Sequence, residues 1–514
     1  MNREDTVKLF LECEAKRKEA LAAGQDENKA HEAARRHWNT WAQKAISERL
    51  DLEKKGLWEN TARADFSGFS FPAAELDSKA VEDRDDMVES PHNEAARIDG
   101  AVIDMRGFIF PGDADFSEAI FAIRTQYDKA WFSSDASFRE AKFEGYTSFS
   151  GARFSSKADF IGATFTSEAN FNNATFKDAL FHNVTFFREA RFFGATLNEN
   201  SIFTRTKFQG DAHFHNATFA GETSFGSACF SEYAFFASAK FLDDALFRNT
   251  SFNYALFDRA SFSGNASFGS ATFTKSTSFR GTEFGSEEKK TDANFTGIKV
   301  ERAFDLTSAC FSKVPNFSQA DFKQAPDLDS VRFPLPRAEP LLSGEPSLIP
   351  QYRMLRRMAI QSADYDREQR AFKGETRSRR WKIDKFWHPE GFFGWCYDWA
   401  ADCGRSILRP FAIWLLSVFV FAVLYLPAGK NALDGCVSDD GSMFWNSLYI
   451  SGRNALVVST AGKSESAVKA YQCLFSSNSA PLGVSSVETF VQAPLSAVLI
   501  FLFLLAVKNR FKIK

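Results

Sequence analysis

Residues 136–176 read ASFREAKFEGYTSFSGARFSSKADFIGATFTSEANFNNATF, and this stretch decides the fold of the central part of the chain. A small residue precedes nearly every Phe by two positions, as in Ala136/Phe138 and Ala141/Phe143. The distance between successive Phe residues alternates between five and six, far from the 3.6 of an α-helix or the 2 of a long strand. The pattern predicts a chain that turns a corner every four or five residues and points a small and a large apolar side chain inward between corners.

The same pattern extends outward in both directions, from Phe110 to Phe333, and it explains why the chain has 58 Phe but only 10 Trp and 10 Tyr. Four such sides make a coil of about 22 residues, and a single coil has no neighbour against which to bury its Phe side chains. Stacking roughly ten coils at a strand spacing of about 4.8 Å solves that problem. The sequence therefore predicts a mainly β fold, a solenoid in which Leu197 takes the place of one Phe.

These residues resemble the pentapeptide-repeat family, which has an apolar residue in the middle of each five and a small residue two positions before it. The resemblance implies a right-handed quadrilateral β-helix. Some members of that family resemble duplex DNA in shape and charge and bind topoisomerases. Here acidic residues such as Glu168 and Asp211 are balanced by basic ones such as Arg153 and Arg188. A DNA mimic needs a strongly negative rod, so we expect neither mimicry nor nucleic-acid binding.

The chain divides into six parts by composition. We expect an N-terminal helical segment, a segment containing an insertion and the entry to the solenoid, the solenoid, a Pro-rich linker, basic juxtamembrane helices and a membrane domain. Their bounds are 1–60, 61–109, 110–333, 334–350, 351–405 and 406–514. A helical hairpin that caps the open end of the solenoid explains the first part, and a partner-binding coiled coil is the alternative.

Two segments near the C-terminus are apolar enough to cross a bilayer, residues 410–429 and 491–507, and neither contains an acidic or basic residue. Arg405 and Arg409 precede the first segment, and Lys508 and Arg510 follow the second. The positive-inside rule then places both termini in the cytoplasm, as expected for a multi-pass protein of the inner membrane. Residues 430–490 would lie outside.

The predicted juxtamembrane helices, residues 351–405, are strongly basic, for example at Arg353, Arg377 and Arg380. A helix face held against an anionic cytoplasmic leaflet explains this charge, and an ordinary solvated helix face is the alternative. The lipid bilayer is therefore an expected partner.

The seven cysteines are too few for a disulfide framework, and no pair has zinc-ligand spacing. Five of them precede the first apolar segment. The other two, Cys436 and Cys473, lie in the segment expected outside, which is oxidising if the host has a periplasm. We predict a disulfide between them.

The external segment contains MFWNSLYISGRNALVVSTAGKSES, which is too short and too polar to span a bilayer. Its apolar residues recur at helical spacing, and a run of small residues follows them. We take Trp445, Leu448, Tyr449 and Leu456 as candidates for a pore helix and Ser459, Thr460, Ala461 and Gly462 as candidates for a filter.

A half-length helix and a Thr-Ala-Gly turn between two spans resemble the pore loop of the two-span potassium-channel family. In that arrangement irregular backbone is tolerated because it lines a water path. The run around Gly462 lacks the aromatic residue and the second Gly of the potassium filter, and Lys463 follows it. The resemblance therefore does not imply potassium selectivity.

We expect an oligomeric, ion-channel-like protein, a homotetramer that passes inorganic ions, because one pore loop cannot enclose a path alone. Its solenoid would be a cytoplasmic sensor, a spacer or a docking domain for a protein partner. The alternative is a membrane-tethered interaction scaffold that conducts no ions. We expect no enzyme and no cofactor or metal, since the seven His residues are scattered and no catalytic or metal-binding spacing recurs.

Overall fold

The computed structural model describes residues 3–55, 57, 61–67, 69–71, 102–335, 345–380, 383–384, 388–404, 406–426, 440–456, 465–475 and 487–511. The chain forms two compact units. The first contains residues 1–334 with 361–363, and the second contains residues 335–360 with 364–514.

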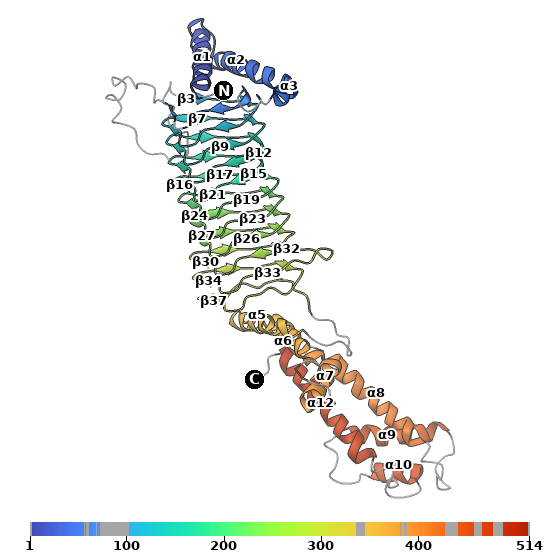
Figure 1. Ribbon diagram of the computed structural model, residues 1–514. Helices are drawn as coiled ribbons and strands as arrows, with labels where there is room; N and C mark the ends of the chain where they lie inside the picture. Colours follow the sequence, from blue (N-terminus) through green and yellow to red (C-terminus); the bar gives the residue numbers. More distant parts are fainter. Residues whose placement is uncertain are drawn as a thin grey trace. The chain divides into compact units, whose positions relative to one another are not determined.

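The first unit is a β-solenoid of about ten coils with helices at its N-terminal end (Figure 1). Its strands form two parallel sheets of 19 and 18 described strands, and each sheet consists of two ladders. Within a ladder, each strand pairs in parallel with the strand one coil later, so that Phe143 lies beside Phe165 and Ala169 beside Ala190. The predicted β-solenoid is confirmed.

The 19-stranded sheet contains the first and second ladders, which share the longer strands β24 and β27. The first ladder is β2 (Ser70–Phe71), β6 (Ile120–Phe121), β10 (Lys142–Phe143), β13 (Thr164–Phe165), β16 (Thr185–Phe186), β20 (Lys207–Phe208), β24 (Cys229–Phe235), β27 (Ser251–Leu256), β30 (Thr272–Phe273), β34 (Lys299–Val300) and β37 (Asp321–Phe322). The second ladder is β3 (Val102–Asp104), β7 (Arg124–Gln126), β11 (Thr147–Ser148), β14 (Ala169–Asn170), β17 (Ala190–Arg191), β21 (Ala212–His213), β24, β27, β31 (Thr277–Ser278) and β35 (Phe304–Asp305).

The 18-stranded sheet contains the third and fourth ladders, which share β12 and β15. The third ladder is β4 (Ile109–Phe110), β8 (Trp131–Phe132), β12 (Arg153–Asp159), β15 (Thr175–Leu180), β18 (Thr196–Leu197), β22 (Thr218–Phe219), β25 (Lys240–Phe241), β28 (Ser261–Phe262), β32 (Glu283–Phe284) and β36 (Cys310–Phe311). The fourth ladder is β1 (Ala64–Asp65), β5 (Ala114–Asp115), β9 (Ala136–Ser137), β12, β15, β19 (Ser201–Ile202), β23 (Thr223–Ser224), β26 (Ala245–Leu246), β29 (Ala266–Ser267) and β33 (Ala293–Asn294).

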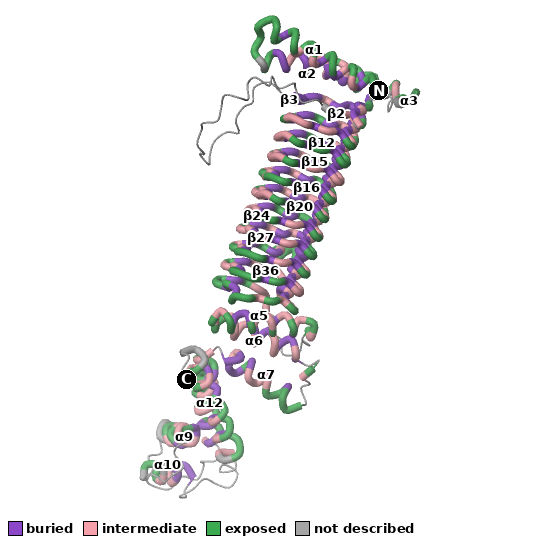
Figure 2. Tube along the Cα trace, turned by 90° about the vertical axis from the view of Figure 1, so that its left-hand side faces the viewer, coloured by how far each residue is buried: buried purple, intermediate pink, exposed green. Residues whose placement is uncertain are grey.

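The core of the solenoid is a set of stacked aromatic columns. Phe203, for example, lies between Phe181 and Phe225 at ring-centroid distances of 4.9 and 4.7 Å, with the rings nearly parallel, and it also contacts Phe192 and Phe214 edge-on. Ala residues two positions before the Phe residues are buried beside them. Leu197 is fully buried in one such column, as the pattern predicted. Buried residues consequently recur along the coils between partly and fully exposed ones (Figure 2).

About every eleventh residue of the solenoid, at alternate corners, lies in the left-handed backbone region, in most cases two positions after a buried aromatic residue. Gly162 follows Phe160 in this way with φ 73°, and Asn173 follows Phe171 with φ 55°. Glycine and asparagine adopt this conformation readily. Glu140 and Lys129 adopt it as well, with φ 56° and 58°.

The first coil begins before residue 110, the boundary expected from the sequence. Strands β1 and β2 pair with β5 and β6, and Ala64 and Phe66 repeat the spacing of small residue and Phe seen in the later coils. Residues 72–101 separate this early repeat from the rest and lie outside the described residues. Because of this long insertion, the early repeat does not continue the regular spacing of the later ones.

Helices α1 (Arg3–Ala22), α2 (Glu27–Ser47) and α3 (Arg49–Lys54) precede the solenoid. Trp38 on α2 is fully buried, stacks on Phe108 and donates a hydrogen bond to the Ile109 carbonyl at 2.8 Å. The Asn39 side chain accepts from the backbone N–H of Ile109 at 2.9 Å and donates to the Gly107 carbonyl at 3.1 Å. Asn39 thus satisfies the backbone of the edge strand β4, which is the capping role expected from the sequence.

The second unit is helical. Its described elements are η1 (Pro346–Leu348), α5 (Ile349–Gln361), α6 (Tyr365–Arg379), α7 (Pro389–Ala401), η2 (Asp402–Gly404), α8 (Leu408–Tyr425), α9 (Asp440–Ala455), α10 (Glu465–Phe475), the π-helical turn η4 (Glu488–Gln492) and α12 (Ala493–Phe511). Helices α5 and α6 lie antiparallel and close together at Gly374, where a Cβ atom would come within 2.4 Å of the Tyr352 ring. Two helical stretches are long and apolar enough to cross a membrane, Leu408–Tyr425 and Phe490–Lys508.

Candidate functional site

Helix α9 lies antiparallel to α8, the first candidate span, and two serine hydroxyls hold the pair together. Ser447 donates to the carbonyl of Ala422, and Ser451, one turn later on α9, donates to the carbonyl of Val418, one turn earlier on α8, at 2.7 Å. Both serines are buried. Each hydroxyl is paired with a backbone carbonyl of the other helix. The two helices can therefore pack closely with both hydroxyl groups hydrogen-bonded.

A buried polar network joins α9 to the start of the second candidate span. The Gln492 amide donates to the backbone carbonyl and the hydroxyl of Ser451, at 2.9 and 2.8 Å. Its carbonyl oxygen accepts a hydrogen bond from the Tyr425 hydroxyl at the end of α8. All three side chains are at most 2% exposed. One amide therefore connects both candidate spans with the helix between them.

The predicted pore-helix residues lie on another face of this helix. Trp445, Tyr449 and Leu456 have exposed fractions of 66, 44 and 53%, and Leu448 is half-buried. The buried face consists instead of Ser447, Ile450, Ser451 and Ala455. The predicted filter residues Ser459, Thr460, Ala461 and Gly462 lie outside the described residues.

The two candidate spans expose much of their apolar surface. In each, only 28% of the most apolar stretch is buried within the chain. Leu416 and Leu424 on α8 are 61 and 58% exposed, and Phe501 and Leu504 on α12 are 62 and 57% exposed. A core helix of a water-soluble unit is largely covered by its own chain. The exposed apolar faces of these two helices are suited to contact with lipid or with another protein.

Helix α10 was not anticipated from the sequence. Its Ala470, Tyr471, Leu474 and Phe475 pack with Phe421, Tyr425 and Ile450 in one buried cluster. The spacing of these four residues by one, three and four positions is a helical signal, but the stretch is only 11 residues long.

The described cysteines fall into two groups. Cys13, Cys229, Cys310, Cys396 and Cys403 are free, whereas Cys473 is disulfide-bonded. Cys436 lies outside the described residues, so its pairing with Cys473 stays a prediction.

The basic segment before the first candidate span is largely neutralised by carboxylates of the same unit. Arg377 forms a two-pronged ion pair with Asp398, at 3.0 and 3.1 Å, and Arg380 pairs with the same carboxylate. All three are buried. Burial raises the pKa of Asp398, but the hydrogen bonds from Arg377 and Arg380 outweigh it and hold this pKa below its usual range. Arg377 and Arg380 therefore belong to the interior of this unit, and contact of the basic segment with an anionic leaflet stays a prediction for its other basic residues, such as Arg353.

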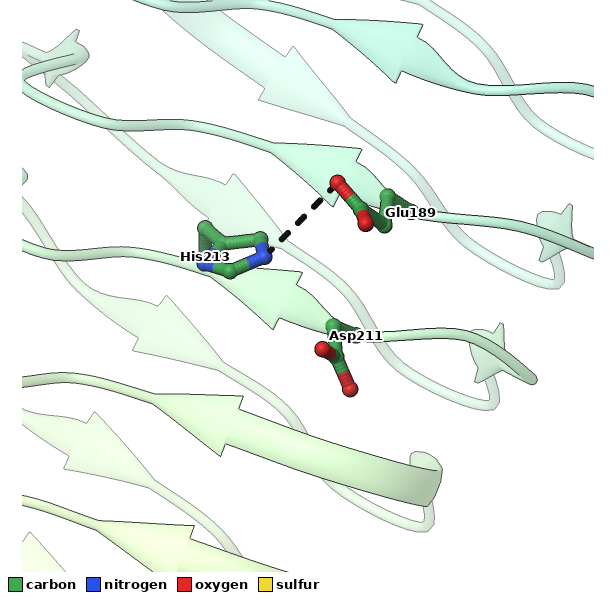
Figure 3. Close-up of side chains that lie close together, drawn as sticks. All are labelled: Glu189, Asp211 and His213. Atoms are coloured by element: carbon green, nitrogen blue, oxygen red, sulfur yellow. Dashed lines mark ion pairs between the residues drawn. The ribbon is translucent and has the colours of Figure 1, made fainter. Parts of the chain in front are cut away.

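A second group of interest lies on the outside of the solenoid, where Glu189, Asp211 and His213 come together (Figure 3). One possible ligand atom from each residue lies within 4.8 Å of the other two. Within the described residues, these two carboxylates and one imidazole form a group that could hold a metal ion. Short metal-binding spacings in the sequence do not reveal it. The signal is the length of a coil, since Glu189 and Asp211 are 22 residues apart and stack on successive coils.

The three side chains are half-buried. Burial lowers the pKa of His213, although Glu189 and Asp211 oppose this shift. The ion pair between His213 Nε2 and Glu189 Oε2 spans 4.0 Å, and Arg191 binds Glu189 more closely, at 2.6 Å.

Comparison with known protein families finds one match, which lies within the solenoid. The family model for pentapeptide repeats, in nine copies, matches residues 149–196. No curated protein and no solved structure matches the chain. The matched residues run from Phe149 through β18 and have the parallel, in-register stacking described above. Residues 149–196 are thus similar to pentapeptide repeats, and the same parallel stacking continues through the other described coils of the solenoid.

Proposed function

We propose that this chain is an oligomeric, ion-conducting protein of the inner membrane, with the solenoid as a cytoplasmic sensor, spacer or docking domain. The observation that carries this proposal is the length of α9 and its packing between the two candidate spans. Helix α9 is 16 residues long, or about 24 Å, which is less than the hydrocarbon thickness of a bilayer.

The contacts of α9 favour an element that enters the membrane and returns. Because α9 lies antiparallel to α8, it runs from the level of Tyr425 back toward the middle of α8. Gln492, which opens the second span, again lies beside Tyr425. Gln492 thus lies between Tyr425, at the end of α8, and Ser451, one turn before the end of α9.

The filter candidates Ser459, Thr460, Ala461 and Gly462 follow α9 directly in the sequence. If α9 enters partway, these small residues follow its inner end, where backbone carbonyls can line a water path. The exposed residues Trp445 and Tyr449 on α9 are then available for contact with a second copy of the chain. We take a fourfold ring as the assembly, because one such loop does not enclose a path by itself.

In the same proposal the four ladders are the sides of a right-handed quadrilateral coil. Both termini lie in the cytoplasm, and Cys436 and Cys473 face the periplasm.

Reconstitution into liposomes tests the proposed function. The purified protein should release trapped ions from the vesicles, and its mass in detergent, corrected for bound detergent, should be a multiple of the chain mass. A monomeric mass together with vesicles that stay tight to every ion tested would contradict the proposal. That outcome would favour the second candidate function.

The second candidate is a membrane-tethered scaffold without ion conduction. The observation in its favour is that the outside of the solenoid exposes large apolar side chains, such as Phe187, Phe193 and Leu242, at 44, 46 and 43%. Such residues suit a protein partner. This role is compatible with the same fold but needs neither α9 nor a ring of copies.

A further inference from the structure

The second ladder carries a column of acidic residues on its outer side. Ala169, Ala190 and Ala212 are paired in register on successive coils, and each is preceded by an acidic residue. Those residues, Glu168, Glu189 and Asp211, form what we call the acidic column. His213 directly follows Ala212 and pairs with Arg191 one coil earlier.

The acidic column carries more negative charge than its basic neighbours neutralise. Arg191 reaches Glu168 at 2.7 Å and Glu189 at 2.6 Å. Arg124 lies over the ring of Tyr146, 4.9 Å from its centroid, and also acts on Glu168. The acidic column thus has three carboxylates and two neighbouring guanidinium groups, and both guanidinium groups act on Glu168, at one end of the column. Asp211, at the other end, has His213 and Glu189 as neighbours.

Each of the three side chains in Figure 3 is oriented by a further contact. Arg191 donates two hydrogen bonds to one oxygen of Glu189, at 2.9 and 2.6 Å. The backbone N–H of Tyr233 donates to one oxygen of Asp211 at 3.1 Å. The ring of Phe235 stacks on the imidazole of His213, with centroids 4.8 Å apart and planes 11° apart. Contacts of this kind orient the ligands in metal sites and hold them ready.

We propose that Glu189, Asp211 and His213 bind a divalent transition-metal ion of the zinc class on the outside of the solenoid. Two carboxylates and one imidazole suit a borderline cation such as Zn²⁺ better than Ca²⁺ or Mg²⁺, which prefer oxygen ligands alone. Metal–ligand bonds of about 2.0–2.2 Å require ligand atoms about 3.4 Å apart in a tetrahedral site. The atoms here lie within 4.8 Å of one another, so metal binding requires them to move closer by roughly 1–1.5 Å.

Three protein ligands leave at least one position for water. Because Glu189 and Asp211 belong to successive coils, the bound ion ties two coils together from outside. A ligand that binds the folded state alone stabilises it, so the metal raises the melting temperature of the solenoid. This inference does not depend on ion conduction by the second unit.

Zinc binding to the full-length protein in detergent tests the proposal. The protein, without an affinity tag and stripped of metal by a chelator, is titrated with Zn²⁺ in competition with a chromogenic chelator. We expect one equivalent to bind and its affinity to fall at least tenfold in His213→Ala and in Asp211→Asn. His182→Ala is the matched control, because His182 lies elsewhere on the solenoid and binds Thr204 at 2.6 Å. Its affinity should equal that of the parent protein.

Two further readouts separate loss of the site from loss of the fold. Without metal, Asp211→Asn should keep the melting temperature of the parent, and with Zn²⁺ only the parent and His182→Ala should gain stability. With Co²⁺, the parent should show the visible ligand-field bands of a protein-bound ion. His213→Ala should lack these bands. Absence of saturable binding, or affinities of His213→Ala and Asp211→Asn within threefold of the parent, would overturn the proposal.

Discussion

The side-chain amide of Gln492 donates a hydrogen bond to the hydroxyl of Ser451 at 2.8 Å, and this contact ties the start of the second candidate span to α9. Ser451 in turn donates to the Val418 carbonyl on the first span. A single buried hydroxyl therefore lies at the junction of three helices. If α9 is the pore helix of a channel, this junction fixes its depth and its angle.

Replacing Ser451 by Ala should destabilise the helical unit by about 1–3 kcal/mol, because the Gln492 amide loses an acceptor while still buried. Ser417→Ala is the matched control. The Ser417 hydroxyl donates to the carbonyl of Trp414 within its own helix, and among the described residues it bonds to no second element. Thermal unfolding in detergent measures the difference. Equal melting temperatures for the two variants would show that the junction contributes nothing to stability.

Phe203→Ala should lower the stability of the solenoid by about 3–5 kcal/mol, since it leaves a cavity in a column of stacked rings. Phe193→Ala removes a ring that is 46% exposed and should change stability far less. The melting of the β-sheet signal in circular dichroism compares the two. A larger loss in Phe193→Ala than in Phe203→Ala would be incompatible with the packing described.

Stability should fall in acid through Asp398. Its pKa is lowered in the folded protein, so its ion pairs stabilise the fold fully above the unfolded carboxyl pKa of about 3.9. This stabilisation declines below that value and is lost as the pH falls through the lower folded pKa. Asp398→Asn should remove this part of the pH dependence. At neutral pH it should cost about 3–5 kcal/mol, since two guanidinium groups stay buried without their carboxylate.

The matched control for Asp398 is Asp384→Asn, because the partner of Asp384, Arg379, is 38% exposed and such a pair contributes little. Melting temperatures between pH 3 and pH 7 provide the measurement. If Asp398→Asn and the parent lose stability in parallel over that range, the ion pairs of Asp398 are not the cause.

The disulfide of Cys473 should involve Cys436. Cys473→Ala and Cys436→Ala should each migrate on non-reducing electrophoresis like the reduced parent protein, because the loop between these cysteines is no longer closed. Cys396→Ala, which removes a free thiol, should migrate like the oxidised parent. An unchanged position for Cys436→Ala would assign Cys473 another partner.

The solenoid was predictable from sequence because its signal is local and repeats many times. Every coil places a small residue two positions before Phe, and a single departure such as Leu197 does not obscure the period. The regular spacing extends only from Phe110, whereas the entry to the solenoid falls in 61–109, where residues 72–101 separate Phe71 from the next repeats. A pattern recognised by regular spacing fails at the first long insertion.

The contacts that arise between coils or between helices were harder to predict. Glu189, Asp211 and His213 meet only because the coil length brings residues 22 positions apart into register. The serines on α9 looked like ordinary polar residues, whereas the structure makes Ser447 and Ser451 its buried face. The aromatic residues Trp445 and Tyr449 gave the stronger sequence signal but lie exposed. In a membrane protein the apolar face can be the outer one, so hydrophobicity alone does not identify the packed side.

Current recording in planar bilayers tests the central claim most directly. The purified parent protein should produce discrete conductance steps, and Thr460→Ala and Gly462→Ala should change the permeability ratios between ions, because both residues belong to the proposed filter. Ser417→Ala should leave these ratios as they are. Absence of any conductance, across all ions and voltages applied, would contradict the account of this chain as a channel.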